Sequence, residues 1–126
     1  MPLLHSAPVI AFTATTDADR AKAFYRDVLG LKLVEESDFA LVFDAAGTML
    51  RVQRVAEVFG GKYTALGWQV SDIAAKVDEL SKAGVRFESY GIPGQDAQGI
   101  WTPPGTSTKI AWFKDPDGNI LSLTQF

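Results

Sequence analysis

Two segments of the chain, one in each half, follow nearly the same pattern. Residues 47–53 read Gly-Thr-Met-Leu-Arg-Val-Gln, and residues 118–124 read Gly-Asn-Ile-Leu-Ser-Leu-Thr. In each segment a turn glycine precedes residues with a period of two, which is typical of a strand with two different faces. Each segment is also the last in a similar order of predicted strands and one predicted helix. We therefore interpret the chain as a duplicated module.

The first half predicts a strand, a helix and three further strands. The first strand is expected at 9–15, Asp17 is a suitable helix N-cap, and Gly30 has the position of a glycine that ends a helix. The apolar face of this helix is formed by residues three or four positions apart: Ala21, Phe24, Tyr25, Val28 and Leu29. The remaining strands are expected at 31–35, 39–44 and 49–54, with a turn at 45–47.

The second half repeats this order after residues 55–63, which contain two adjacent glycines and no period. A strand is expected at 66–70, Asp72 is the cap, and Gly84 ends a helix with an apolar stripe of Ile73, Val77 and Leu80. Further strands are expected at 85–89, 109–114 and 120–125. The prediction is an α+β fold in one domain, residues 1–126, with two βαβββ modules: about 7–54 and about 64–126, joined by the linker 55–63.

Composition narrows the class of protein. At 126 residues, with 47% hydrophobic and 21% charged residues, the chain is typical of one globular domain. No apolar run reaches the ~18 residues of a membrane span, and the N-terminal residues lack the pattern of a signal peptide, so we expect a cytoplasmic protein without membrane contact. The lack of cysteine excludes disulfides and thiolate metal sites. A net charge of −3 without a basic cluster makes nucleic acid an unexpected partner.

Two motifs connect this pattern to a known family. Residues 17–31 read Asp-Ala-Asp-Arg-Ala-Lys-Ala-Phe-Tyr-Arg-Asp-Val-Leu-Gly-Leu, and residues 113–119 read Phe-Lys-Asp-Pro-Asp-Gly-Asn. The first resembles the first-module signature of the vicinal oxygen chelate superfamily, and the second resembles its last hairpin. That superfamily includes glyoxalase I, extradiol dioxygenases and bleomycin-resistance proteins. The resemblance implies two modules whose sheets curl into a half-open cup, with the helices outside and the ligand inside.

The resemblance also implies where metal-dependent members hold their metal, on the first and last strand of each module. Those positions are Ile10, Arg51, Ala65 and Ser122 in this chain. Isoleucine and alanine have no donor atom, arginine is a cation without a free lone pair, and one serine hydroxyl does not hold a metal against water. A shifted alignment gives equally inert residues: Val9, Ala11, Leu66 and Gly67. The only histidine, His5, precedes the first strand. We expect no metal and no cofactor.

Alternation along the strands predicts one mixed face and one dry face. If the four metal positions point into the cup, so do the residues two positions away, and this inner face mixes apolar with polar side chains. No carboxylate is clearly placed on it. The opposite face is almost purely apolar, as expected beneath helices: Val9, Ala11, Thr13, Leu50, Val52, Leu66, Trp68, Val70, Leu121 and Leu123. The candidate ligand-binding residues are Arg51, Gln53, Phe12, Met49, Gln69, Trp101 and Ser122.

Arg51 is the first candidate anchor, because a guanidinium can bind a carboxylate, a phosphate or a polarised carbonyl through paired hydrogen bonds. The alternative is that Arg51 pairs with Glu35 or Asp44, or extends to the rim of the cup. The glutamines and the serine either add neutral hydrogen bonds to a ligand or only satisfy their neighbours.

The loop at 90–106 contains three prolines and four glycines and is either a binding loop or a solvated connection. Its Trp101 is either a flap over a flat ligand or a hydrophobic plug on the sheet edge. Trp112 and Phe113 are adjacent, so one faces into the cup and the other away, and the sequence does not say which.

Three functions remain open. The first is a metal-independent binder that sequesters a small molecule, similar in logic to the bleomycin-resistance proteins, which hold a drug in a cleft at a dimer interface. The second is an enzyme of the same superfamily, a lyase, isomerase or dioxygenase with an atypical site, in which Arg51 stabilises an oxyanion on a carbonyl or aromatic substrate. The third is a structural or regulatory dimer, since a half-open sheet leaves edges that favour pairing. A homodimer is expected in each case.

Overall fold

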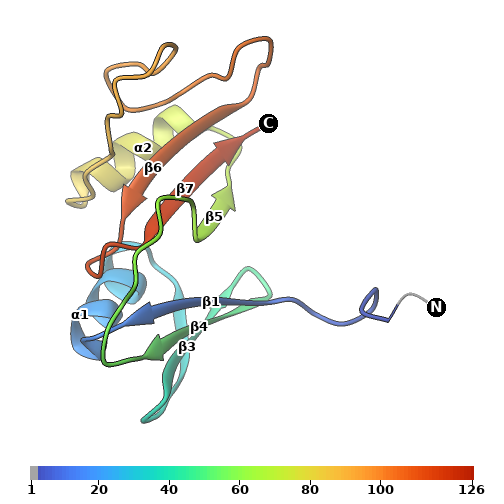
Figure 1. Ribbon diagram of the computed structural model, residues 1–126, viewed down its shortest axis with the longest axis vertical. Helices are drawn as coiled ribbons and strands as arrows, with labels where there is room; N and C mark the ends of the chain where they lie inside the picture. The colour runs from blue at the N-terminus through green and yellow to red at the C-terminus, as the bar shows by residue number, and fades with distance from the viewer. Residues whose placement is uncertain (1–2) are drawn as a thin grey trace.

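The computed structural model describes residues 3–126 and shows two β-sheets, one above the other along the long axis of the molecule (Figure 1). The first sheet has the strand order β1-β4-β3-β2 and the second has the order β5-β7-β6. The first module contains β1 (Ile10–Thr15), α1 (Ala18–Lys22), the π-helical turn η1 (Ala23–Val28), β2 (Lys32–Glu36), β3 (Ala40–Ala45) and β4 (Thr48–Arg54). The second module contains β5 (Leu66–Gln69), α2 (Ile73–Lys82), β6 (Lys109–Lys114) and β7 (Ile120–Gln125). The predicted α+β class is confirmed.

The duplication is visible in the pairing of the strands. In each module the first strand lies parallel to the last one, β1 beside β4 and β5 beside β7, while the last hairpin is antiparallel. Within residues 3–126, no strand pair joins the two sheets. Neither helix in this part of the chain has the length and apolar character needed to cross a membrane.

The prediction of a regular strand at 85–89 is wrong. Phe87 forms a single bridge to Phe113, and the Glu88 N–H donates to the Trp112 carbonyl at 2.8 Å. The side chain of Gln95 then replaces strand pairing, because its amide accepts from the Tyr90 N–H at 2.8 Å and donates to the Glu88 carbonyl at 2.9 Å. The chain turns away at this point, so β6 remains the edge of a three-stranded sheet.

Both predicted helix caps are confirmed. The Asp17 side chain accepts from the Arg20 N–H, and the Asp72 side chain accepts from the Ala75 N–H, each at 3.1 Å. The first helix widens into a π-helical turn, where the Leu29 N–H donates to the Phe24 carbonyl at 2.9 Å. It ends at Gly30, whose φ of 76° lies in the left-handed region that favours glycine.

The helices cover one face of each sheet, and α2 lies behind the second sheet in Figure 1. Residues of the predicted dry face form much of the buried core, including Leu50, Val52, Leu121 and Leu123. Val9 is an exception, since it precedes β1 and its side chain is 76% exposed. Among residues 3–126, no helix covers the opposite face of either sheet (Figure 1).

A buried side-chain network joins the two modules. The Tyr25 hydroxyl on η1 donates to Asp115 Oδ2 at 2.6 Å, and Asn119 Nδ2 donates both to Asp115 Oδ2 at 2.7 Å and to the Ala14 carbonyl at 2.9 Å. Asp117 Oδ1 accepts from Arg20 Nη2 at 2.9 Å. Burial and the adjacent Asp115 carboxylate raise the pKa of Tyr25 far above its ordinary value, so its hydroxyl stays protonated and keeps donating. The hairpin turn of the second module is thereby attached to the helix of the first.

Candidate ligand-binding site: the open faces of the two sheets

The uncovered face of the first sheet, here called the first open face, is arranged in rows across the strands. Cross-strand pairing places Phe12 beside Arg51, Arg51 beside Val42, and Val42 beside Glu35. The next row contains Ile10, Met49 and Asp44, and Gln53 pairs with Ala14 in the row on the other side. Three apolar side chains of this face are unusually open for their type, since Ile10, Phe12 and Met49 are 45%, 49% and 42% exposed, whereas Val42 is buried.

The structure corrects the expectation that the inner face lacks carboxylates. A bulge between Leu33 and Glu35 shifts the alternation of β2, so Glu35 pairs with Val42 and shares its row with Arg51. Asp44 also faces this side, where its Oδ1 accepts from the Gly47 N–H at 3.1 Å. Among residues 3–126, no carboxylate lies within salt-bridge distance of Arg51, so the alternative pairing with Glu35 or Asp44 does not form.

The second open face belongs to β5, β7 and β6. Ser122 pairs with Gly67 on one side and Trp112 on the other, while Thr124 pairs with Gln69 and Ile110. Ser122 is buried, and a Cβ added at Gly67 would meet its Oγ at 2.6 Å. The hydroxyl therefore lies over the bare backbone of Gly67, and the larger groups of this face, including Trp112 and Lys114, come from β6 and its neighbours.

Trp101 is attached to the edge of this sheet. Its N–H donates to the Ile110 carbonyl at 2.7 Å, and the Ile110 N–H donates back to the Trp101 carbonyl at 2.9 Å. Its indole Nε1 donates to the Pro93 carbonyl at 3.0 Å, and its ring centroid lies 5.8 Å from that of Trp112. Of the two interpretations, this geometry fits a plug on the sheet edge, with its ring turned toward the open face.

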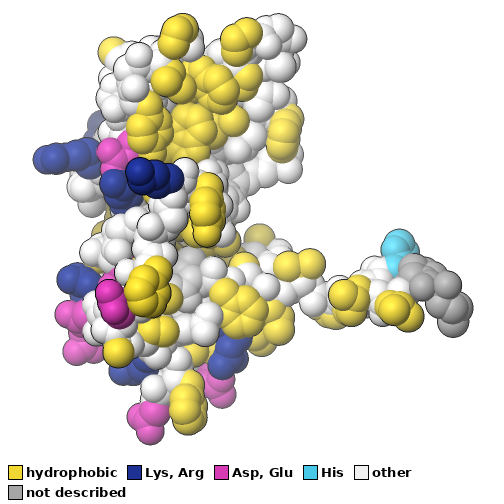
Figure 2. All heavy atoms as spheres, in the orientation of Figure 1, with side chains coloured by type: hydrophobic (Ala, Val, Ile, Leu, Met, Phe, Trp, Pro, Cys, Tyr) yellow, Lys and Arg dark blue, Asp and Glu magenta, His cyan; other side chains and the backbone are white. Residues whose placement is uncertain are grey.

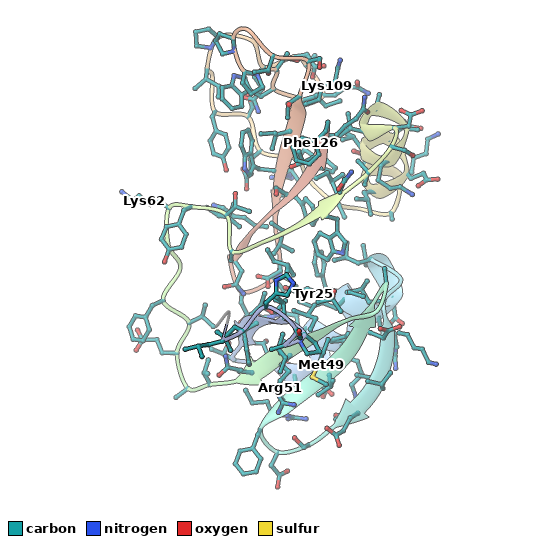
Figure 3. All side chains as sticks on the ribbon, turned by 90° about the vertical axis from the view of Figure 1, so that its right-hand side faces the viewer. Tyr25, Met49, Arg51, Lys62, Lys109 and Phe126 are labelled. Carbon is teal, nitrogen blue, oxygen red and sulfur yellow. The ribbon has the colours of Figure 1, made fainter. Side chains whose placement is uncertain are left out.

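The seven candidate residues are thus divided between two sheets. Phe12, Met49, Arg51 and Gln53 lie together on the first open face, whereas Gln69, Trp101 and Ser122 lie on the second. Figure 3 shows Met49 and Arg51 on the first sheet, well below Phe126 at the end of the second. Within one copy of the chain, these residues do not surround a common cavity.

Four residues on or beside the second open face were not among the predicted site residues: Lys62 of the linker, Tyr90, Lys114 and Trp112, whose orientation the sequence had left open. They line two adjoining hollows of about 350 and 440 Å³ between the linker and the sheet. A signal for two of them was available, because the tight turn at 115–118 pairs Ser122 with Trp112 and Ile120 with Lys114. Trp112 therefore faces outward, while Phe113 is fully buried.

Comparison with known proteins decides the family. A model of the Glyoxalase/Bleomycin resistance protein/Dioxygenase superfamily matches residues 9–123. The chain belongs to this superfamily. The resemblance found in the sequence motifs is therefore confirmed.

Relatives from this superfamily span most of the chain. The lactoylglutathione lyase of Salmonella typhimurium is 31% identical over 116 residues, which cover 86% of this chain and 84% of the lyase. The crystal structure of a glyoxalase/bleomycin resistance protein/dioxygenase from Alicyclobacillus acidocaldarius has a TM-score of 0.72 at 19% identity and covers 96% of this chain and 92% of its own. The fosfomycin resistance protein FosX of Listeria monocytogenes has a TM-score of 0.73 at 14% identity and covers 96% of this chain and 93% of its own. At such identities the two structures support the fold alone.

The metal of metal-dependent superfamily members does not fit the residues of this chain. The four corresponding positions carry Ile10, Arg51, Ala65 and Ser122, none of which is a carboxylate or an imidazole. In the described range 3–126, no group of three or more His, Cys, Asp or Glu side chains is arranged to hold a metal ion. A guanidinium at one of these positions repels a divalent cation.

Proposed function

We propose that this protein binds a small organic molecule on the open faces of its two sheets, without a metal at the position used by metal-dependent members of the superfamily. This is a binding or sequestration function, similar in logic to that of the bleomycin-resistance proteins. The observation that supports it best is Arg51, which lies between Phe12 and Val42 on an uncovered sheet face and has no carboxylate partner within the described residues 3–126. Such a group can orient a ligand that carries a carboxylate, a phosphate or a polarised carbonyl.

A second copy of the chain is part of this proposal. Ile10, Phe12 and Met49 leave apolar surface open on the first face, and a partner would remove that surface from water. The two open faces of one chain do not meet, so facing a second copy would bring first-face and second-face residues together. Sedimentation velocity tests this point, because a monomer at micromolar concentration would exclude a cleft between subunits.

The binding function is tested by a thermal-shift screen of a library of small organic anions. At a ligand concentration one hundred times Kd, a bound ligand stabilises the folded state by about 2.7 kcal/mol. Arg51→Ala is expected to weaken the hits about tenfold to one hundredfold, as the loss of a charge-assisted hydrogen bond does. Arg54→Ala is the matched control, since Arg54 lies on the same strand but pairs with Glu36 at 3.1 Å. Hits that are indifferent to Arg51→Ala, or the lack of any hit, would refute the proposal.

Metal independence is tested separately by elemental analysis of the purified protein. The expected result is less than a tenth of an equivalent of any divalent ion, and unchanged ligand binding after treatment with chelator. A stoichiometric divalent ion that survives dialysis would contradict it.

A second candidate function is catalysis. It is favoured by the 31% identity to a lactoylglutathione lyase and by Glu35, which the bulge of β2 places in the same row as Arg51. In this case Arg51 would stabilise an oxyanion while Glu35 moves a proton. Isomerase turnover of α-hydroxy carbonyl compounds that persists in chelator and is lost in Glu35→Gln would establish it. Turnover that is absent, or retained in Glu35→Gln, would reject it.

A further inference from the structure

We infer that the second open face is a binding site for a planar aromatic molecule with an anionic group, formed by Tyr90 and Trp112 together with Lys62 and Lys114. This inference rests on the proposed function and deepens it, because it assigns a ligand class to a face for which no charged candidate residue was predicted. It depends on contacts that are independent of Arg51.

The aromatic part of the site is a rigid corner. The Tyr90 and Trp112 rings meet edge to face, with centroids 5.5 Å apart and an interplanar angle of 68°. The indole of Trp112 is fixed because its Nε1 donates to Thr64 Oγ1 at 3.1 Å. The backbone of Tyr90 is fixed by the hydrogen bond from its N–H to Gln95 Oε1. The Trp112 ring, held in this way, can stack on a planar ligand without a large loss of side-chain entropy.

The cationic part adjoins this corner. Lys62, Tyr90 and Ile120 line both hollows, Trp112 lines one, and Lys114 lines the other. Figure 2 shows hydrophobic side chains gathered over the upper module, with Lys and Arg side chains along the lower edge of the patch. Figure 3 shows Lys62 on the linker, away from Arg51 on the first sheet. A ligand on the aromatic corner would therefore place its charge between the linker and β6.

These ammonium groups are largely free to meet an anion. The Lys114 side chain is 51% exposed, and its nearest carboxylate, Glu88, is 3.8 Å away, at the outer limit of an ion pair. Among residues 3–126, no carboxylate lies within salt-bridge distance of Lys62. Neither hollow is lined by an acidic residue. This charge pattern favours an anion over a neutral or cationic ligand.

The linker encloses the site from one side. A Cβ added at Gly61 would meet the Tyr63 ring at 2.6 Å, so this ring lies directly on the bare backbone of Gly61. A Cβ at Gly60 would meet the Gly118 carbonyl at 3.7 Å, which places the linker against the β6–β7 turn. The hollows of about 350 and 440 Å³ have the size of small-ligand sites.

The test is calorimetric titration of the full chain with three probes: 2-naphthoate, 2-naphthalenemethanol and cyclohexanecarboxylate. The first has both the ring and the charge, and each of the others lacks one of them. We expect 2-naphthoate to bind about tenfold more tightly than either. Lys114→Gln should weaken it about two- to fivefold, as for an exposed ion pair. Trp112→Leu should weaken it about tenfold or more, and Tyr90→Leu provides a second test of the corner if Trp112→Leu unfolds.

Lys109→Gln is the matched control, because Lys109 lies on the same strand as Lys114 but on its opposite face. Equal affinity for the naphthoate and its alcohol, equal effects of Lys109→Gln and Lys114→Gln, or no binding of 2-naphthoate would overturn the inference. If Lys114→Gln instead lowers the dimer fraction without any probe binding, the face is covered by a second copy and the inference is also overturned. Library hits that depend on Arg51 would still support the proposed function in each of these outcomes.

Discussion

The turn between β3 and β4 and the turn between β6 and β7 each begin with an aspartate whose side chain accepts from backbone N–H groups. Asp44 is exposed, and its Oδ1 accepts only from the Gly47 N–H. Asp115 is 5% exposed and accepts from the N–H groups of Asp117 and Asn119 as well as from Tyr25 and the Asn119 side chain. The Asp44 turn is therefore a local turn, whereas the Asp115 turn also connects the two modules. We call this connection, formed by Tyr25, Asp115, Asn119, Arg20 and Asp117, the joint.

This difference explains how the two open faces are held. The second hairpin, which carries Ser122 and Trp112, is oriented by the helix of the first module through Tyr25. The first hairpin, which carries Arg51, has an exposed turn, and its position depends on its own sheet. Changes at the second turn should therefore affect the whole molecule, and changes at the first turn should remain local.

The largest expected effect is that of Asp115→Ala. It leaves the Tyr25 hydroxyl and the Asn119 N–H without an acceptor in a buried place, so we expect a loss of about 3 kcal/mol in the free energy of unfolding. Asp44→Ala removes one exposed hydrogen bond and should cost about 0.5 kcal/mol. Urea unfolding of both variants measures the contrast, and equal losses would show that the two turns are equivalent.

Tyr25→Phe should have the next largest effect, because it keeps the buried ring and removes only the hydrogen bond to a carboxylate. The expected loss is about 2 kcal/mol. Since the pKa of Tyr25 is raised in the folded state, its contribution is complete below the ordinary value of 10.0 and is lost as the pH rises above it. The variant should therefore approach the wild type in stability above that pH. A constant difference from pH 7 to 11 would argue against this role of the hydroxyl.

The fold was predictable from local signals, and the joint was not. Caps at Asp17 and Asp72 and the alternation along β4 and β7 are encoded within a few residues. The contact between Tyr25 and Asp115 spans 90 residues, and each partner has a sufficient local explanation, one as helix packing and the other as turn chemistry. Nothing in either motif indicates the other.

The candidate site was likewise predictable where it depends on regular strands and not where the chain is irregular. A period of two placed Phe12, Met49 and Arg51 correctly on one face, since those strands are regular. It did not place Glu35 on that face, because a bulge shifts the alternation of β2. The predicted strand at 85–89 is interrupted by the side chain of Gln95. Irregularities of this kind depend on side-chain hydrogen bonds and neighbouring strands rather than on the local pattern.

The equivalent positions Arg51 on β4 and Ser122 on β7 differ in the size of the residue beside them on the neighbouring strand. Gly67→Ala tests whether the small neighbour of Ser122 is required. Phe12 stands beside Arg51 in the first module, whereas Gly67 stands beside Ser122 in the second. The new Cβ would lie 2.6 Å from Ser122 Oγ, so we expect a loss of about 1 kcal/mol. In Gly67→Ala/Ser122→Ala the Oγ is gone, and the nearest side-chain atom of residue 122 is its Cβ at 3.9 Å. The double variant should recover most of the loss, and failure to recover would mean that Ser122 is not the obstacle.

The smallest effect concerns Asp117, the second carboxylate of the joint. Burial acts to raise its pKa, but hydrogen bonds from the Thr16 N–H and hydroxyl and the charge of Arg20 outweigh it and hold the pKa below the ordinary 3.8. Because the pKa of Asp117 is lower in the folded protein than in the unfolded chain, its charge stabilises the fold above the unfolded pKa, and this stability is lost as the pH falls through the folded pKa.

Arg20→Gln removes an ion pair whose arginine is 46% exposed, so it should cost about 0.5 kcal/mol in the free energy of unfolding at pH 7. This cost should shrink as the pH falls below 3.8 and the Asp117 carboxylate takes up a proton, while the cost of Lys82→Gln, at a pair on α2 outside the joint, should be close to zero at pH 7. Chemical unfolding of both variants from pH 7 downward measures the difference, and a cost of Arg20→Gln that does not change with pH would show that Arg20 supports the joint by packing rather than by charge.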